Sequence, residues 1–334
     1  MKKTIINIIK YLLFAGGGAF LFYKVLEGQD IDALWAIVER TNWLYLFLSV
    51  FCGYIAFINR GVRWMQLLRP MGMNFRTIHS INAVNFGYFA NLLVPRIGEV
   101  ARCTVLGKKV NAPVDKLLGT VILERVIDTF MLMLLFGTVV LLKADDFFLF
   151  LEENVELPNT GVLVIWGCVA AGLGFLALFG LRRWARKSQW GPINKLIAWL
   201  RGLRSGLLSI KEVEKPGEFV FHTLFIWLMY FMMTYLCFLA LEELTHLSLE
   251  DALFVMLAGG IGMVIPSPGG IGSYHYAVIL SLTFIGVSND VATAFATLVH
   301  SAQTVMILAT GIVATILLYS VKNDTPNEPA ENPE

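Results

Sequence analysis

The residues of this chain that could carry chemistry are charged side chains beside helix-breaking backbone. In segment 91–102, Arg96, Glu99 and Arg102 follow closely on Pro95. An arginine fork can hold a phosphate group through two parallel hydrogen bonds, and Glu99 could orient either arginine when no phosphate is bound. The alternative is that both arginines mark the cytoplasmic membrane boundary, where basic side chains reach the interface. The segment is therefore either a phosphate site or a boundary.

A second charged group, Glu124, Arg125 and Asp128, lies inside an apolar stretch. At a rise of about 1.5 Å per residue, Glu124 lies roughly 10 Å into that stretch, and it shares a helix face with Asp128 at i,i+4. Each charge costs about 2.5–3.5 kcal/mol at the bilayer centre, so such residues face a bundle interior and pair. We expect Arg96 or Arg102 to approach the carboxylates. The group forms either a structural ion-pair clamp or the wall of a substrate or proton pathway.

Arg60, Arg63 and Trp64 end an earlier apolar stretch, with the two arginines at i,i+3. Trp and basic residues gather at membrane interfaces. These residues are expected to anchor the helix there and to touch lipid headgroups.

Near the C-terminus, Pro266-Ser267-Pro268-Gly269-Gly270-Ile271-Gly272 places helix breakers between hydrophobic residues. Membrane proteins tolerate such a run only beside protein or a polar cavity. Its usual use is a substrate or ion site built from two half-helices. A half-helix beginning near Gly272 would direct its positive N-terminal dipole toward the same anion as the arginines. We expect Pro268, Gly269 and Gly270 to face segment 95–98 across one polar cavity near the membrane midplane, so that both segments form one site.

His275 follows this run and His300 lies in a later apolar stretch. Histidine titrates near neutral pH and could couple transport to protons; the alternative is a hydrogen-bonded packing role between helices. The four cysteines are scattered, with neither metal-site spacing nor a disulfide framework. We expect no metal and no cofactor.

Composition indicates a polytopic all-α membrane protein. Hydrophobic residues make up 57% and charged residues 15% of the chain, and its mean hydropathy is +0.67, which excludes an ordinary soluble domain. No nucleic-acid partner is expected. Apolar stretches of spanning length fall at 5–26, 43–59, 117–142, 161–181, 219–241 and 291–319. Two more, 78–95 and 252–287, are short or broken.

The basic residues suggest how these stretches cross the membrane. Suppose that stretches 78–95 and 252–287 each enter the membrane and return to the side from which they came. The cytoplasmic segments are then the N-terminus, 59–116, 182–218 and the C-terminal tail. These segments hold 22 of the 26 Lys and Arg residues, as the excess of basic residues in cytoplasmic loops requires. The fold prediction is six full spans plus two re-entrant hairpins, with half-repeats at 5–142 and 161–319 in an inverted repeat. A plain eight-span arrangement is the alternative.

The expected location is the cytoplasmic membrane, with both termini in the cytoplasm. We expect one transmembrane domain over residues 1–320 and a disordered cytoplasmic tail over 321–334. Within the joining segment 182–218, apolar and basic residues recur at helical spacing. That pattern indicates a helix on the anionic inner-leaflet lipids, or only a linker.

Four motifs in this order resemble the lysylphosphatidylglycerol synthase transmembrane-region family of flippase-like membrane proteins. They are Arg60/Arg63-Trp64, segment 91–102, Glu124 to Asp128 and Pro266 to Gly272. The similarity covers roughly residues 5–320. In multidomain members this region is associated with moving an aminoacylated phospholipid between leaflets, and a separate soluble domain, not expected here, makes that lipid. The resemblance implies lipid translocation rather than aminoacyl transfer. Many members carry Glu where this chain has His275, which argues against a cationic lysyl headgroup.

The leading hypothesis is a translocator, not an enzyme, for a phospholipid or lipid-linked anionic headgroup, working by alternating access. There are two alternatives. One is an intramembrane lipid or polyprenyl-phosphate transferase with Glu124 or Asp128 as base. The other is a non-transporting scaffold for an envelope-lipid synthase. The candidate substrate-binding residues are Arg96, Arg102, Glu99, Glu124, Arg125, Asp128, Asn91, Arg60, Arg63, Pro268, Gly269, Gly270, Gly272 and His275.

Overall fold

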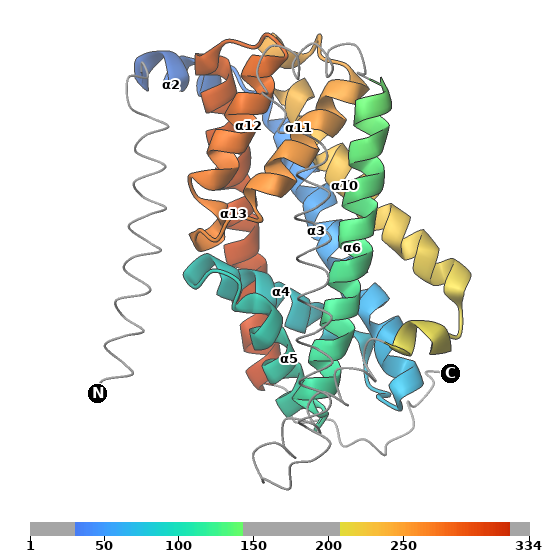
Figure 1. The fold of residues 1–334 in the computed structure, drawn as a ribbon. Coiled ribbons are helices and arrows are strands. Elements are labelled where there is room, and N and C mark those ends of the chain that lie inside the picture. Colours follow the sequence, from blue (N-terminus) through green and yellow to red (C-terminus); the bar gives the residue numbers. More distant parts are fainter. Residues whose placement is uncertain (1–30, 143–207, 321–334) are drawn as a thin grey trace, which may run out of the picture.

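The computed structural model describes residues 31–142 and 208–320 (Figure 1). Within these ranges the chain is helical and contains no strand, so the predicted all-α class is confirmed for this part. The predicted spans 5–26 and 161–181, most of the joining segment 182–218 and the tail 321–334 lie outside the described residues.

Within the described ranges, four helices are long and apolar enough to cross a membrane. They are α3 (Trp43–Leu68), α6 (Val114–Leu142), α10 (Pro216–Ala240) and α13 (Asn289–Ser320). Their positions match four of the apolar stretches found in the sequence. The stretch 43–59 was predicted too short, however, because α3 continues through Arg60 and Arg63 to Leu68.

The two short or broken stretches each belong to a pair of shorter helices. Stretch 252–287 forms both helices of its pair, whereas 78–95 forms one helix and its partner lies beyond the predicted bounds. The first pair is α4 (Thr77–Leu93) and α5 (Gly98–Lys109), and the second is α11 (Leu249–Gly262) and α12 (Ser273–Phe284). None of these helices has the roughly 20 residues that a membrane crossing needs. The members of each pair pack against one another. In Figure 1, α4 and α5 lie in the lower half of the bundle and α11 and α12 in the upper half.

The first hairpin, α4–α5, closes where two glycines let the helices approach. A Cβ atom on Gly87 would lie 2.9 Å from the carbonyl oxygen of Gly98, so a side chain there would push the helices apart. The side-chain oxygen of Asn91 accepts a hydrogen bond from the Gly98 backbone N–H at 2.6 Å. This bond satisfies one of the free N–H groups at the start of α5.

The second hairpin, α11–α12, turns through the glycine-rich run. Gly269, Gly270 and Gly272 have φ values of +60°, +83° and +83°, which lie in the left-handed region that glycine adopts without a steric penalty. The helices also approach closely near this turn, since a Cβ on Gly262 would lie 2.7 Å from the Ser273 carbonyl oxygen. The run thus breaks the helix, as its composition predicted.

The tips of the two hairpins touch. A Cβ on Gly269 would lie 2.8 Å from a methyl group of Leu92 at the end of α4. From the other direction, the Arg96 guanidinium donates a hydrogen bond to the Val264 carbonyl. The two hairpin tips, predicted to form one site, are thus in direct contact.

Each hairpin has its own apolar core. One cluster joins α10, α11, α12 and α13, where the rings of Phe238 and Phe295 lie 5.4 Å apart. The other joins α3, α4, α5 and α6 around Trp64, Cys103 and Leu117. The remaining described elements are α2 (Ile31–Glu39) and four short 3-10 helices, η1 (Arg69–Met71), η2 (Ser209–Glu212), η3 (Glu242–Leu244) and η4 (Pro268–Gly270).

Candidate anion-binding site

Two carboxylates of α6 lie against the arginines of α3 and α5. Asp128 accepts hydrogen bonds from Arg60 and Arg63, each at 2.8 Å. Glu124 lies one turn earlier and contacts Arg63 at 3.5 Å and, more closely, Arg102. The side chains of Arg63 and Glu124 are fully buried. The i,i+4 spacing of the carboxylates and the i,i+3 spacing of the α3 arginines bring the charges together.

Neutral groups hold the arginines of this network in place. The guanidinium of Arg102 lies 4.5 Å from the centre of the Trp64 ring, a cation–π arrangement. Trp64 is itself fixed by a 2.8 Å hydrogen bond from its indole N–H to Thr120. Arg60 donates to the Tyr230 hydroxyl at 3.3 Å, so α10 also contributes to the site.

The buried network carries more positive than negative charge. In the ion pairs between described residues, the three arginines Arg60, Arg63 and Arg102 meet the two carboxylates Glu124 and Asp128, which leaves a net charge of +1. Among the described residues, the buried Nε atoms of Arg63 and Arg102 find no hydrogen-bond acceptor. A buried charge without compensation is costly, so the network favours an added anion.

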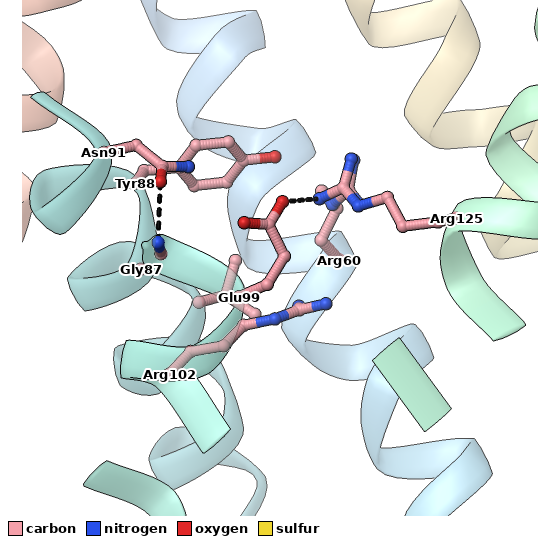
Figure 2. A pocket seen from close by; sticks show the side chains of 9 residues that line it. Arg60, Gly87, Tyr88, Asn91, Glu99, Arg102 and Arg125 are labelled. Atoms are coloured by element: carbon pink, nitrogen blue, oxygen red, sulfur yellow. Dashed lines mark hydrogen bonds and ion pairs between the residues drawn. The ribbon is translucent and has the colours of Figure 1, made fainter. Parts of the chain in front are cut away.

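A second ion pair lies next to this network and is more accessible. Glu99 of α5 contacts Arg125 of α6 at 3.3 Å, and their side chains are 29% and 48% exposed. Figure 2 shows Glu99 and Arg102 extending from α5 toward Arg60 and Arg125. This pair is more exposed to solvent than the contacts of the buried network and is therefore easier to exchange.

A small pocket opens between these charges and the first hairpin. Its empty space, including its open mouth, is about 240 Å³. The lining residues come from α3, α4, α5 and α6 and are Arg60, Val84, Gly87, Tyr88, Asn91, Gly98, Glu99, Arg102 and Arg125. Three guanidinium groups, one carboxylate and the neutral polar groups of Tyr88 and Asn91 thus face one space.

Arg96 does not line this pocket, and of the two arginines expected to approach the carboxylates of α6 it is Arg102 that does so. The backbone of Arg96 is in the left-handed region, with φ of 61°, which turns the residue toward the second hairpin and its hydrogen bond with Val264. The sequence could not reveal this because the direction of a side chain in a turn depends on backbone angles.

Arg60 and Arg63 are not interfacial anchors. They are 4% and 0% exposed, since the carboxylates of α6 satisfy them inside the bundle. Complementary spacing on the two helices was the signal for this pairing. Tyr88 and Tyr230 were not predicted at all. Tyr88 stacks on Phe57 with the ring centres 3.9 Å apart and reaches the Tyr230 hydroxyl at 3.4 Å.

The residues of the second hairpin do not line the pocket. Gly269 packs on Leu92, and its carbonyl oxygen lies 2.9 Å from Nε2 of His300. The His275 and His300 rings meet edge to face at 4.7 Å. The turn Pro268–Gly270 packs against α4, whereas the Gly272 backbone N–H donates to Nδ1 of His275 at 3.4 Å within the second hairpin. The pocket therefore does not join the two broken segments, which the sequence predicted to share one polar cavity.

No group of three or more potential metal ligands occurs among the described residues. The candidate site is thus built from guanidinium, carboxylate, amide and hydroxyl groups. These groups can bind an anion by charge and hydrogen bonds.

Comparisons with known proteins match this chain to membrane proteins. The chain is 24% identical over 313 residues to a UPF0104 membrane protein of Methanothermobacter thermautotrophicus, covering 86% of this chain and 88% of that protein. It is 29% identical over 246 residues to a UPF0104 membrane protein of Methanocaldococcus jannaschii, covering 72% and 97%. No solved structure matches. The model of the lysylphosphatidylglycerol synthase TM region matches residues 7–311, and the chain belongs to that family of membrane proteins.

Proposed function

We propose that this protein translocates a lipid with an anionic phosphate headgroup across the membrane and that the pocket beside Arg102 binds the phosphate. The observation that carries the proposal is the buried network of three arginines and two carboxylates, with its net charge of +1, beside a pocket. A charge excess in a low-dielectric interior favours a bound anion more strongly than the same excess in water.

The network also prepares the arginines for binding. Arg60 and Arg102 line the pocket while their other contacts, with Asp128 and Glu124, keep their positions fixed. A phosphate would meet guanidinium groups that need little reorganisation. A phosphate oxygen beside Arg102 would also provide an acceptor for its buried Nε.

The two hairpins suggest how a headgroup would move. In the proposal they are re-entrant, enter from opposite faces, and belong to inverted half-repeats at 5–142 and 161–319. Their contact rests on few groups, Gly269 against Leu92 and Arg96 on Val264. Separating the tips would open a path at the membrane midplane, and closing them would block it, as alternating access requires.

The enzymatic alternative has less support. A general base needs a carboxylate that is free to take a proton, whereas Glu124 and Asp128 each face two arginines. The scaffold alternative predicts no lipid movement, so the transport experiment below distinguishes it from translocation. The cytoplasmic membrane, with both termini in the cytoplasm, remains the proposed location.

The test is reconstitution into liposomes that contain fluorescent phospholipids, with a membrane-impermeant quencher added outside. A translocator exposes more than the outer-leaflet half of the fluorophore, whereas protein-free liposomes do not. Arg102→Lys keeps the charge but removes the planar fork, and we expect at least a tenfold slower rate. Lipid movement equal to that of protein-free liposomes would refute translocation and favour a scaffold.

A further inference from the structure

The pocket is lined by one carboxylate, and this carboxylate can change without dismantling the buried network. Glu99 lies in the first turn of α5 and lines the pocket, and its ion-pair contact is with Arg125 at 3.3 Å. By contrast, Glu124 and Asp128 are each held between two arginines and are 0% and 13% exposed. Glu99 is thus the carboxylate positioned to meet a ligand.

The charge balance of the whole site defines the ligand that suits it. Four guanidinium groups and three carboxylates, joined by ion pairs, add up to +1 and comprise Arg60, Arg63, Arg102, Arg125, Glu99, Glu124 and Asp128. A phosphodiester carries one negative charge and would neutralise this set. A phosphomonoester carries about −1.5 to −2 near pH 7 and would leave excess negative charge facing Glu99.

We propose that the pocket selects lipids with a monoanionic phosphodiester headgroup and that Glu99 excludes dianionic phosphomonoesters. The inference rests on the proposed function and adds to it the substrate class and a specificity residue. The physical reason is that uncompensated charge is costly in a partly desolvated site. Like charges placed together suppress binding of the wrong partner, as naturally specific interfaces do.

The neutral groups of the pocket fit the same class. Tyr88 and Asn91 line it without adding charge, so they can contact the ester oxygens or hydroxyl groups of a diester headgroup. Arg125, with 48% of its side chain exposed, can leave Glu99 and turn to the phosphate. The exposed pair thereby adjusts to the ligand while the inner network stays intact.

The experiment uses three lipids with identical acyl chains: phosphatidylglycerol as the diester, phosphatidic acid as the monoester and phosphatidylcholine as the zwitterion. Binding is measured at pH 8 with short-chain forms, by thermal stabilisation of the full-length protein in detergent. Movement of the long-chain forms is measured in proteoliposomes. We expect the unmodified protein to prefer phosphatidylglycerol over phosphatidic acid by about tenfold or more.

Glu99→Gln raises the site charge to +2 and should lower that preference at least tenfold, through tighter binding of phosphatidic acid. The matched control is Glu218→Gln, which removes a carboxylate from an exposed ion pair with Lys215 at 2.8 Å, outside this pocket. It should leave the preference unchanged. Arg125→Gln should weaken both anionic lipids relative to phosphatidylcholine.

The outcomes separate this inference from the proposed function. The charge-selection inference is wrong if Glu99→Gln is folded and its lipid preference is unchanged. It is also wrong if the unmodified protein binds phosphatidic acid as tightly as phosphatidylglycerol. In both cases lipid can still move. If none of the three lipids moves but phosphatidylglycerol binds selectively, the inference stands and translocation fails. If glycerophosphoglycerol, the headgroup without acyl chains, binds as tightly as the lipid, the site serves a soluble diester and the lipid substrate is refuted.

Discussion

Replacing Glu124 with Gln should destabilise the protein strongly, because it removes one partner from a dry ion-pair network. Glu124 is fully buried and contacts Arg63 and Arg102. Arg63 keeps its 2.8 Å contact with Asp128, so the loss falls mainly on Arg102, which is 3% exposed. Removing one member of a buried pair costs about 3–5 kcal/mol. Cation–π contact with Trp64 keeps part of Arg102 compensated, so we expect about 3 kcal/mol.

A double variant distinguishes charge from general damage to packing. Arg102→Met combined with Glu124→Gln removes both charges and should recover about 2 kcal/mol of the loss, giving a clear coupling energy. The free energy of unfolding is measured by denaturant titration in detergent micelles, with tryptophan fluorescence as the signal. Trp64 lies beside Arg102 and reports locally.

The control for this series is Glu218→Gln. Its carboxylate pairs with Lys215 at the surface, with side chains 53% and 68% exposed, and such pairs contribute at most about 1 kcal/mol. If Glu124→Gln costs no more than this control, or if the coupling energy is below about 0.5 kcal/mol, the network is hydrated and the argument for a buried excess of charge fails.

Three further predictions concern the helix contacts and the membrane topology. Gly61→Ala should cost about 1–3 kcal/mol, since the added Cβ would lie 2.5 Å from the Ile81 Cα atom, whereas Gly137→Ala, with nothing within 4 Å, should be neutral or stabilising when unfolding is compared. Arg96→Ala removes the hydrogen bond to Val264 and should let the hairpin tips move more freely. Cysteines on the two tips that are too far apart to react in the unmodified protein should then cross-link faster, and lipid binding should be unchanged. Loss of lipid binding would show that Arg96 belongs to the binding site. Single cysteines at positions 108 and 242 should react with membrane-impermeant reagents from opposite membrane faces. Reaction of both cysteines from the same face would contradict the inverted arrangement of the hairpins.

The candidate site was partly predictable because a membrane-depth charge has few stable environments. Glu124 and Asp128 at i,i+4 had to face the bundle interior and find cations, and the contact between Arg102 and Glu124 was expected and is present. Proline and glycine likewise required the helix of stretch 78–95 to end near Pro95 and stretch 252–287 to break. Local backbone chemistry and the cost of burying charge determine both features, whatever the remaining fold.

Tertiary structure alone decided which arginines join the site. Arg60, Arg63, Arg96 and Arg102 look alike in sequence, each near an apolar boundary. Three of them point to α6, while Arg96 points to Val264 because the tip of the first hairpin adopts a left-handed backbone. Side-chain direction depends on helix rotation and on turn angles that packing sets. The sequence therefore determines that charges must pair in the interior, and the packing of α3, α5 and α6 determines the pairs.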